Sequence, residues 1–259
     1  MFNIQIQNIS EDKKISVITI TEITPPLKKY IDENIVSICE GATDSEIDDI
    51  KHQYLNFLST KNTTTKHGSV AEFFVHLYLR SEGYRQEFMF FNLEEGSIKK
   101  GFDGVFTKNN QEFIVESKSG LSSTQKISHS LKLREAYNDI RDYVSGKTTK
   151  GNNNPWRNAY NHASQIDINT KKSVREKFKQ LSRLYEKKEF KDISEFNIIP
   201  CSTIFILNKK SDSSSSYHDN LTNTLDSFSA NSIQHTAYSI HAVSITKNTF
   251  NQFISYLES

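Results

Sequence analysis

Two apolar runs on either side of a turn signal constrain the fold of this chain more than any other feature. Residues 102–107 and residues 112–118 flank the dipeptide Asn109-Asn110, and together they are rich in phenylalanine, valine and isoleucine. Asparagine tolerates the left-handed backbone conformation that a two-residue hairpin turn requires. The segment is therefore predicted to form a β-hairpin around which the other elements pack.

Helical and strand-like patterns alternate along the rest of the chain. Before the hairpin, we expect a helix from Ser69 to about Ser81, a strand over Gln86–Asn92 and a turn around Gly96. After it, the expected elements are helices at about 128–144, 155–166 and 172–188, a buried strand at 198–207, a low-complexity segment at 209–216, a short helix, a strand at 237–245 and a terminal helix. This order predicts an α/β (α+β) protein with a mixed central sheet flanked by helices.

The N-terminal segment has a pattern of its own. Phe2–Gln7 and Lys14–Thr21 alternate apolar and polar residues, which predicts a second β-hairpin. Pro25-Pro26 can open a helix that Gly41 ends, and a further helical pattern runs from Asp44 to Leu58. A small extension of one hairpin and two helices is therefore expected ahead of the main domain.

Composition limits the class of protein. The polar run Ser59–Lys66 is predicted to be a linker, which divides the chain into residues 1–62 and residues 63–259. No stretch approaches the ~18 uninterrupted apolar residues of a membrane helix, so no membrane contact is expected. The two cysteines, Cys39 and Cys201, lie far apart and lack metal-ligand spacing, which favours a cytoplasmic protein without a disulfide framework.

Charge is distributed unevenly along the chain. The net charge is only +1, but residues 119–191 contain sixteen Lys and Arg against seven Asp and Glu, a local balance of +9. Such a region can bind a polyanion such as DNA, although a solvated helix face would show the same pattern. The candidate DNA contacts are Lys126, Lys171, Lys172, Arg175 and Lys179.

The predicted hairpin carries three charged residues that can converge. The pattern Asp/Glu-x-Lys occurs six times in the chain, but only Glu116-Ser117-Lys118 ends an apolar strand. Residues two apart in a strand project to the same face, so Glu116 and Lys118 would point together. In a hairpin closed at Asn109-Asn110, Asp103 approaches Glu116 from the neighbouring strand. An ordinary ion pair on a strand would explain the Glu116–Lys118 spacing alone, but not the added carboxylate.

Two carboxylates and an ammonium group at the edge of an apolar sheet need compensation. A divalent cation, Mg²⁺ or Mn²⁺, provides it, because two carboxylates and a backbone carbonyl suffice as protein ligands. We therefore expect Asp103, Glu116 and the main chain of Ser117 as metal ligands. Lys118 would orient a nucleophile or stabilise charge that develops on a phosphate group.

The order of these residues resembles that of the PD-(D/E)xK nucleases, over about residues 67–145 and a later strand. Gly68 to Glu72, then Gly101 to Asp103, then Glu116 to Lys118 are similar to the HamA family, the nuclease subunits of Hachiman antiphage systems. The resemblance implies a restriction-endonuclease-like core and a metal-dependent DNA endonuclease in bacterial defence, in complex with a superfamily 2 helicase. Two features depart from it: Phe102 replaces the name-giving proline, and the expected Gln-x-x-x-Tyr signature is not formed after Lys118, because Gln125 is followed four residues later by His129.

Several alternatives stay open at this point. Glu72 is either a fourth catalytic residue that binds metal, or the end of a capping box that begins at Ser69. The protein as a whole is either the defence nuclease described above, a free-standing restriction endonuclease, or a DNA-binding or assembly subunit without catalytic activity.

Overall fold

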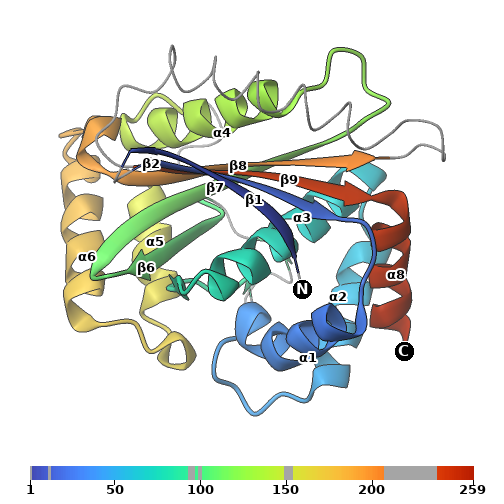
Figure 1. Ribbon diagram of the computed structural model, residues 1–259. Coiled ribbons are helices and arrows are strands. Elements are labelled where there is room, and N and C mark those ends of the chain that lie inside the picture. Colours follow the sequence, from blue (N-terminus) through green and yellow to red (C-terminus); the bar gives the residue numbers. More distant parts are fainter. Residues whose placement is uncertain (1, 11–12, 93–96, 99–100, 149–153, 207–237) are drawn as a thin grey trace.

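A seven-stranded mixed sheet forms the centre of the molecule (Figure 1). The computed structural model describes residues 2–10, 13–92, 97–98, 101–148, 154–206 and 238–259. The strands follow the order β1 (Asn3–Ser10), β2 (Lys13–Ile20), β9 (Tyr238–Thr246), β8 (Asn197–Ile206), β7 (Gln111–Leu121), β6 (Gly104–Lys108) and β3 (Arg85–Gln86). The central pairs β2–β9, β9–β8 and β8–β7 are parallel, whereas the outer pairs are antiparallel. The predicted mixed sheet is confirmed.

The β6–β7 hairpin forms as predicted. Asn109 and Asn110 both have positive φ angles, 51° and 60°, which is the conformation of a two-residue turn that suits the twist of the flanking strands. Pairing runs from Lys108 opposite Gln111 to Gly104 opposite Val115. The residue before β6, Asp103, therefore stands beside Glu116.

Helices cover both faces of the sheet, and the alternation of β7 side chains decides which residues meet which helices. Phe113 and Val115 belong to the core formed with α1 (Pro25–Cys39), α2 (Ile47–Ser59), α3 (Thr63–Ser81) and α8 (Lys247–Glu258). Ile114 belongs to the core formed with α4 (His129–Val144), α5 (Pro155–Ala163) and α6 (Lys172–Glu186). Figure 1 shows α3 and α4 on opposite sides of the sheet. Even-numbered residues of β7 thus face α4.

The predicted linker Ser59–Lys66 is wrong over its second half, because α3 already begins at Thr63. The Asn62 side chain caps the helix by accepting a hydrogen bond from the Thr65 amide at 2.9 Å. The division into residues 1–62 and 63–259 stays a prediction. The two parts share one sheet, since β2 pairs with β9, and one apolar core around α3.

The predicted strand Gln86–Asn92 is also wrong, since it consists of β3 and the separate two-residue strand β4 (Phe91–Asn92), which pairs with β5 (Ser97–Ile98). Between β3 and β4, Phe88 enters the α5–α6 core and Phe90 enters the α3 core. The amide of Phe90 donates to the Ile38 carbonyl at the end of α1. Residues two apart in a regular strand share one face, so Phe88 and Phe90 cannot fill two different cores from a continuous strand. The predicted turn at Gly96, the 209–216 segment and the short helix after it lie outside the described residues.

The start of α3 can be tested by removing its cap. Replacing Asn62 with alanine should lower the free energy of unfolding by ~1 kcal/mol, the usual contribution of an asparagine cap. Chemical denaturation of wild type and Asn62→Ala would measure the difference, with Asn56→Ala in the interior of α2 as control. Equal stability of the wild type and Asn62→Ala would show that α3 does not begin at Thr63.

Candidate active site

Lys118 joins two carboxylates at the interface of β7 and α4. Its ammonium group contacts Glu116 Oε1 on the same strand and lies 2.9 Å from Asp139 Oδ2 on α4. Glu116 and Lys118 are two residues apart in a strand and therefore share one face, as predicted. The Lys118 side chain is 22% exposed and Asp139 is 19% exposed, so the cluster lies at the boundary between core and solvent.

Asp103 completes the cluster from the neighbouring strand. The Asp103 carboxylate accepts a hydrogen bond from the Ser117 amide at 2.6 Å, through Oδ2. This contact continues the β6–β7 ladder by one step, with a side chain in place of a carbonyl group. The structure thus brings together Asp103, Glu116, Ser117 and Lys118, all of which the sequence indicates.

Glu116 is strongly perturbed by its surroundings. It is 2% exposed, and its Oε2 atom is buried without a hydrogen-bond partner in the structure. Burial raises the pKa of Glu116 to about 8, and the charges of Asp103 and Asp139 add to the increase, whereas Lys118 opposes it. The site therefore holds more negative charge than one lysine neutralises.

Neighbouring groups respond to the same charges. Burial alone would lower the pKa of Lys118, but Glu116 and Asp103 raise that pKa above its ordinary value, so the lysine stays charged. Burial and the carboxylates of Glu116 and Asp139 raise the pKa of Tyr143. The pKa of the Cys201 thiol is raised by burial and by Asp103, which makes this cysteine an unreactive neighbour on β8.

Sequence reasoning did not find Asp139 and Tyr143. The two residues lie four apart on α4 and so project from the same side of that helix. Ala136, Ile140 and Tyr143, which surround Asp139 on α4, are buried. A carboxylate among the buried residues of an amphipathic helix is therefore the sequence signal that could have indicated Asp139. Gln125 and His129 do not complete a Gln-x-x-x-Tyr pattern after Lys118, and Asp139 and Tyr143 on α4 have the same four-residue spacing.

Glu72 lies on the other side of the sheet. It sits in the middle of α3, so the predicted capping box is wrong: Ser69 is already inside the helix and donates to the Tyr54 hydroxyl at 2.9 Å. Glu72 is 6% exposed, with Oε1 3.7 Å from Nε2 of the buried His76. The sheet separates α3 from Lys118 and Asp139. A metal-binding role for Glu72 stays a prediction.

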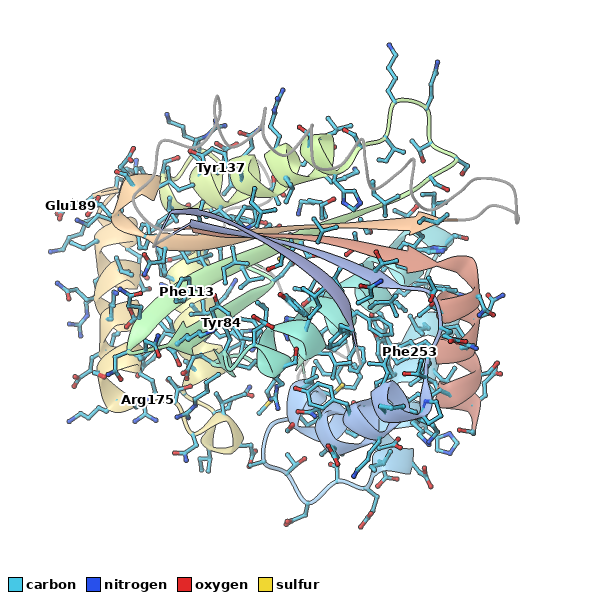
Figure 2. All side chains as sticks on the ribbon, in the orientation of Figure 1. Tyr84, Phe113, Tyr137, Arg175, Glu189 and Phe253 are labelled. Atoms are coloured by element: carbon cyan, nitrogen blue, oxygen red, sulfur yellow. The ribbon has the colours of Figure 1, made fainter. Side chains whose placement is uncertain are left out.

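Lys171 and Arg175, two of the candidate DNA contacts, lie away from the site. Lys171 donates to the Asn110 side chain at 3.2 Å, at the turn of the hairpin. That turn is six residues from Glu116, roughly 20 Å along the strand. Figure 2 shows Arg175 on α6 far from Tyr137 on α4, the helix that also carries Asp139. Lys126, in contrast, is exposed in the segment between β7 and α4. DNA contacts by these residues, and by Lys172 and Lys179, stay a prediction.

The donor set suits one divalent cation. In the described part of the chain, no three His, Cys, Asp or Glu side chains are grouped as a metal centre. Two carboxylates, Asp103 and Glu116, remain, and the buried Glu116 Oε2 is an oxygen that a cation would satisfy. Mg²⁺ accepts so few protein ligands because it keeps several waters. The residues present therefore fit the ion, with the remaining positions for the Ser117 carbonyl and water.

Fold and site together define an α/β protein with a carboxylate–lysine centre on its central strands. The HamA family model matches residues 2–259, so the chain belongs to the HamA family. This membership indicates a nuclease-like protein of the multi-subunit Hachiman antiphage defence system. No curated protein and no solved structure matches the chain. None of the helices in the described ranges has the length and apolar character needed to cross a membrane.

The raised pKa of Glu116 predicts how stability depends on pH without metal. Between its ordinary value of 4.5 and the raised value of about 8, the folded protein holds a proton that the unfolded chain has lost. Stability should therefore fall as pH rises through this window, by at most about 1.4 kcal/mol per pH unit. Glu116→Gln should flatten this slope in denaturation experiments with EDTA. An unchanged slope would show that Glu116 titrates normally.

Proposed function

We propose that this protein is a metal-dependent DNA endonuclease that acts in bacterial antiviral defence, in complex with a superfamily 2 helicase. The observation that supports this proposal most is the position of Lys118, which contacts Glu116 and Asp139 next to Asp103. An ordinary strand ion pair does not gather three carboxylates around one partly buried lysine. Membership of the HamA family supports the defence role.

The carboxylates of Asp103 and Glu116 would hold Mg²⁺ or Mn²⁺, together with the Ser117 carbonyl. When bound, the ion supplies polarisation of the scissile phosphate and lowers the pKa of a bound water. Glu116 must lose its proton to serve as a ligand, and a cation favours that loss. Asp103 is fixed for the same task by the hydrogen bond from the Ser117 amide.

Lys118 would stabilise the negative charge that builds up on the phosphate, or orient the attacking water. Its ammonium group is held on two sides, by Glu116 within its own strand and by Asp139 on α4. Asp139 therefore acts through Lys118 as a positioning residue. Because it is anchored on a different element, it fixes the lysine relative to both β7 and α4.

DNA would reach this site past the segment that contains Lys126, which is exposed at the far end of β7 from the hairpin turn. Contacts by Lys171, Lys172, Arg175 and Lys179 would then involve a more distant part of the nucleic acid or a different strand. A free-standing restriction enzyme is the alternative, but family membership favours a multi-subunit system. The intact Asp103, Glu116 and Lys118 argue against a non-catalytic subunit.

The roles of Glu116 and Lys118 can be separated by metal binding. Both Glu116→Ala and Lys118→Ala should abolish plasmid cleavage, Lys118→Ala by ~10²–10³-fold or more, since preorganised charge is commonly worth this much in rate. Calorimetric titration of Mn²⁺ should show weakened binding for Glu116→Ala and retained binding for Lys118→Ala. Full cleavage by either variant would contradict the proposal.

Asp139 should affect catalysis without affecting metal binding. Asp139→Asn keeps the shape but removes the charge that holds Lys118, so kcat should fall by roughly 10–100-fold while KM and Mn²⁺ affinity change little. Asp139→Glu should recover part of the rate. The matched control is Asp142→Asn on the same helix, which pairs with surface Arg141 at 3.0 Å. Equal rates for Asp139→Asn and wild type would exclude the positioning role.

A further inference from the structure

A cavity at the open edge of the sheet gathers positive charge away from the candidate active site. Its volume is about 430 Å³, and Gly83, the Asn109-Asn110 turn and the first turn of α6 line it. Three of the lining residues are cations that come from three different elements: Arg85 on β3, Lys108 on β6, and Lys171 at the start of α6. Cavities of this size hold small organic ligands.

Lys108 and Lys171 are held in place by contacts with neutral groups. Lys108 donates to the Glu82 carbonyl at 2.6 Å and lies over the Tyr84 ring, which packs on Phe113 (Figure 2). Lys171 donates to the amide oxygen of Asn110. These carbonyl, amide and ring contacts orient the two ammonium groups toward the cavity lining.

Arg85 and Glu112 show how the remaining charges are arranged. Arg85 donates to the carbonyls of Ile168 and Asn169, and its Nε atom lies 3.7 Å from the buried Glu87. Glu112 also lines the cavity, but Lys177 neutralises it at 2.7 Å. The local charge balance therefore stays positive.

The first turn of α6 adds hydrogen-bond donors to this charge. Lys171 occupies the cap position without a side-chain cap bond, and no acidic residue lies in the first turn. Ser173 and Val174 of this turn line the cavity. Amide groups in the first turn of a helix carry partial positive charge that favours anions, and here the Val174 amide also donates to the Lys171 carbonyl at 3.0 Å. The helix end thus adds to a cavity that three cations already define.

We propose that this cavity binds a phosphate ester of nucleotide size. Phosphate is the anion that such a combination of ammonium, guanidinium and helix amides recognises, and the volume leaves room for an attached sugar or base. The ligand is either a mononucleotide or one unit of a nucleic-acid strand, which present the same group. The proposal does not depend on the nuclease activity, because the cavity lies at the opposite end of the β6–β7 hairpin from Glu116.

Binding measurements in EDTA, where cleavage is excluded, test the proposal. The probes are a short fluorescein-labelled single strand, the matching duplex, and an ADP that carries a methylanthraniloyl fluorophore. Lys108→Gln combined with Lys171→Gln should weaken binding of at least one probe about tenfold, comparable to the loss of one charge-assisted hydrogen bond. Loss for the labelled ADP would identify a nucleotide site, and loss for DNA alone would identify a backbone site.

The control variant combines Lys187→Gln with Lys191→Gln. It removes the same amount of positive charge at the C-terminal end of α6 and just after it. Its affinities should stay within about twofold of wild type for a specific site. Lys171→Gln alone, an exposed change, should show a smaller loss in the same direction and guards against misfolding of the double variant. Wild-type affinity in the Lys108/Lys171 variant, equal losses in both double variants, or no binding of any probe to wild type would overturn the proposal.

Discussion

The contact of Lys118 with both Glu116 and Asp139 is the interaction on which the rest of the site depends. It places one ammonium group among three carboxylates at a boundary between strand and helix. Removing one partner of such a cluster leaves an uncompensated buried charge, which costs far more than a surface pair contributes. Burial raises the pKa of Glu116, and the excess of negative charge in the arrangement raises it further.

The alternation of β7 separates packing from chemistry along a single strand. Phe113 and Val115 fill the core under α3, while Ile114 fills the core under α4. Further along the α4 face, Glu116 and Lys118 follow Ile114 at alternate positions of the strand. The apolar part anchors the strand on both faces, and this anchoring gives the charged part a fixed geometry.

Positive charge is divided between the two ends of the β6–β7 hairpin. Lys126 lies beyond the end of β7 that follows Lys118, whereas Lys171 lies at the turn, where Arg85 and Lys108 line a cavity. A nuclease-like subunit of a larger defence system can use two such regions for different tasks, one beside the carboxylate–lysine centre and one for binding at the hairpin turn. This division distinguishes the chain from a protein with one continuous basic groove.

The sequence by itself determined most elements and the centre of the site. The Asn109-Asn110 turn fixed the register of the hairpin, and register fixed Asp103 beside Glu116, because both are local properties of adjacent strands. Periodicity likewise predicted most helices, since it reflects one apolar face per helix. The beginning of α3 was missed because Asn62, a capping residue, lay in a polar run that also suits a linker.

Only the tertiary structure decided which distant residues meet. Asp139 is 21 positions from Lys118, and no local pattern states that α4 turns this carboxylate toward β7. Because α3 packs on the face of the sheet opposite to α4, Glu72 lies apart from Lys118. The packing of α6 places Lys171 at the hairpin turn and not at the site. Periodicity shows that a helix has a buried face, but the packing of helices on the sheet determines what that face contacts.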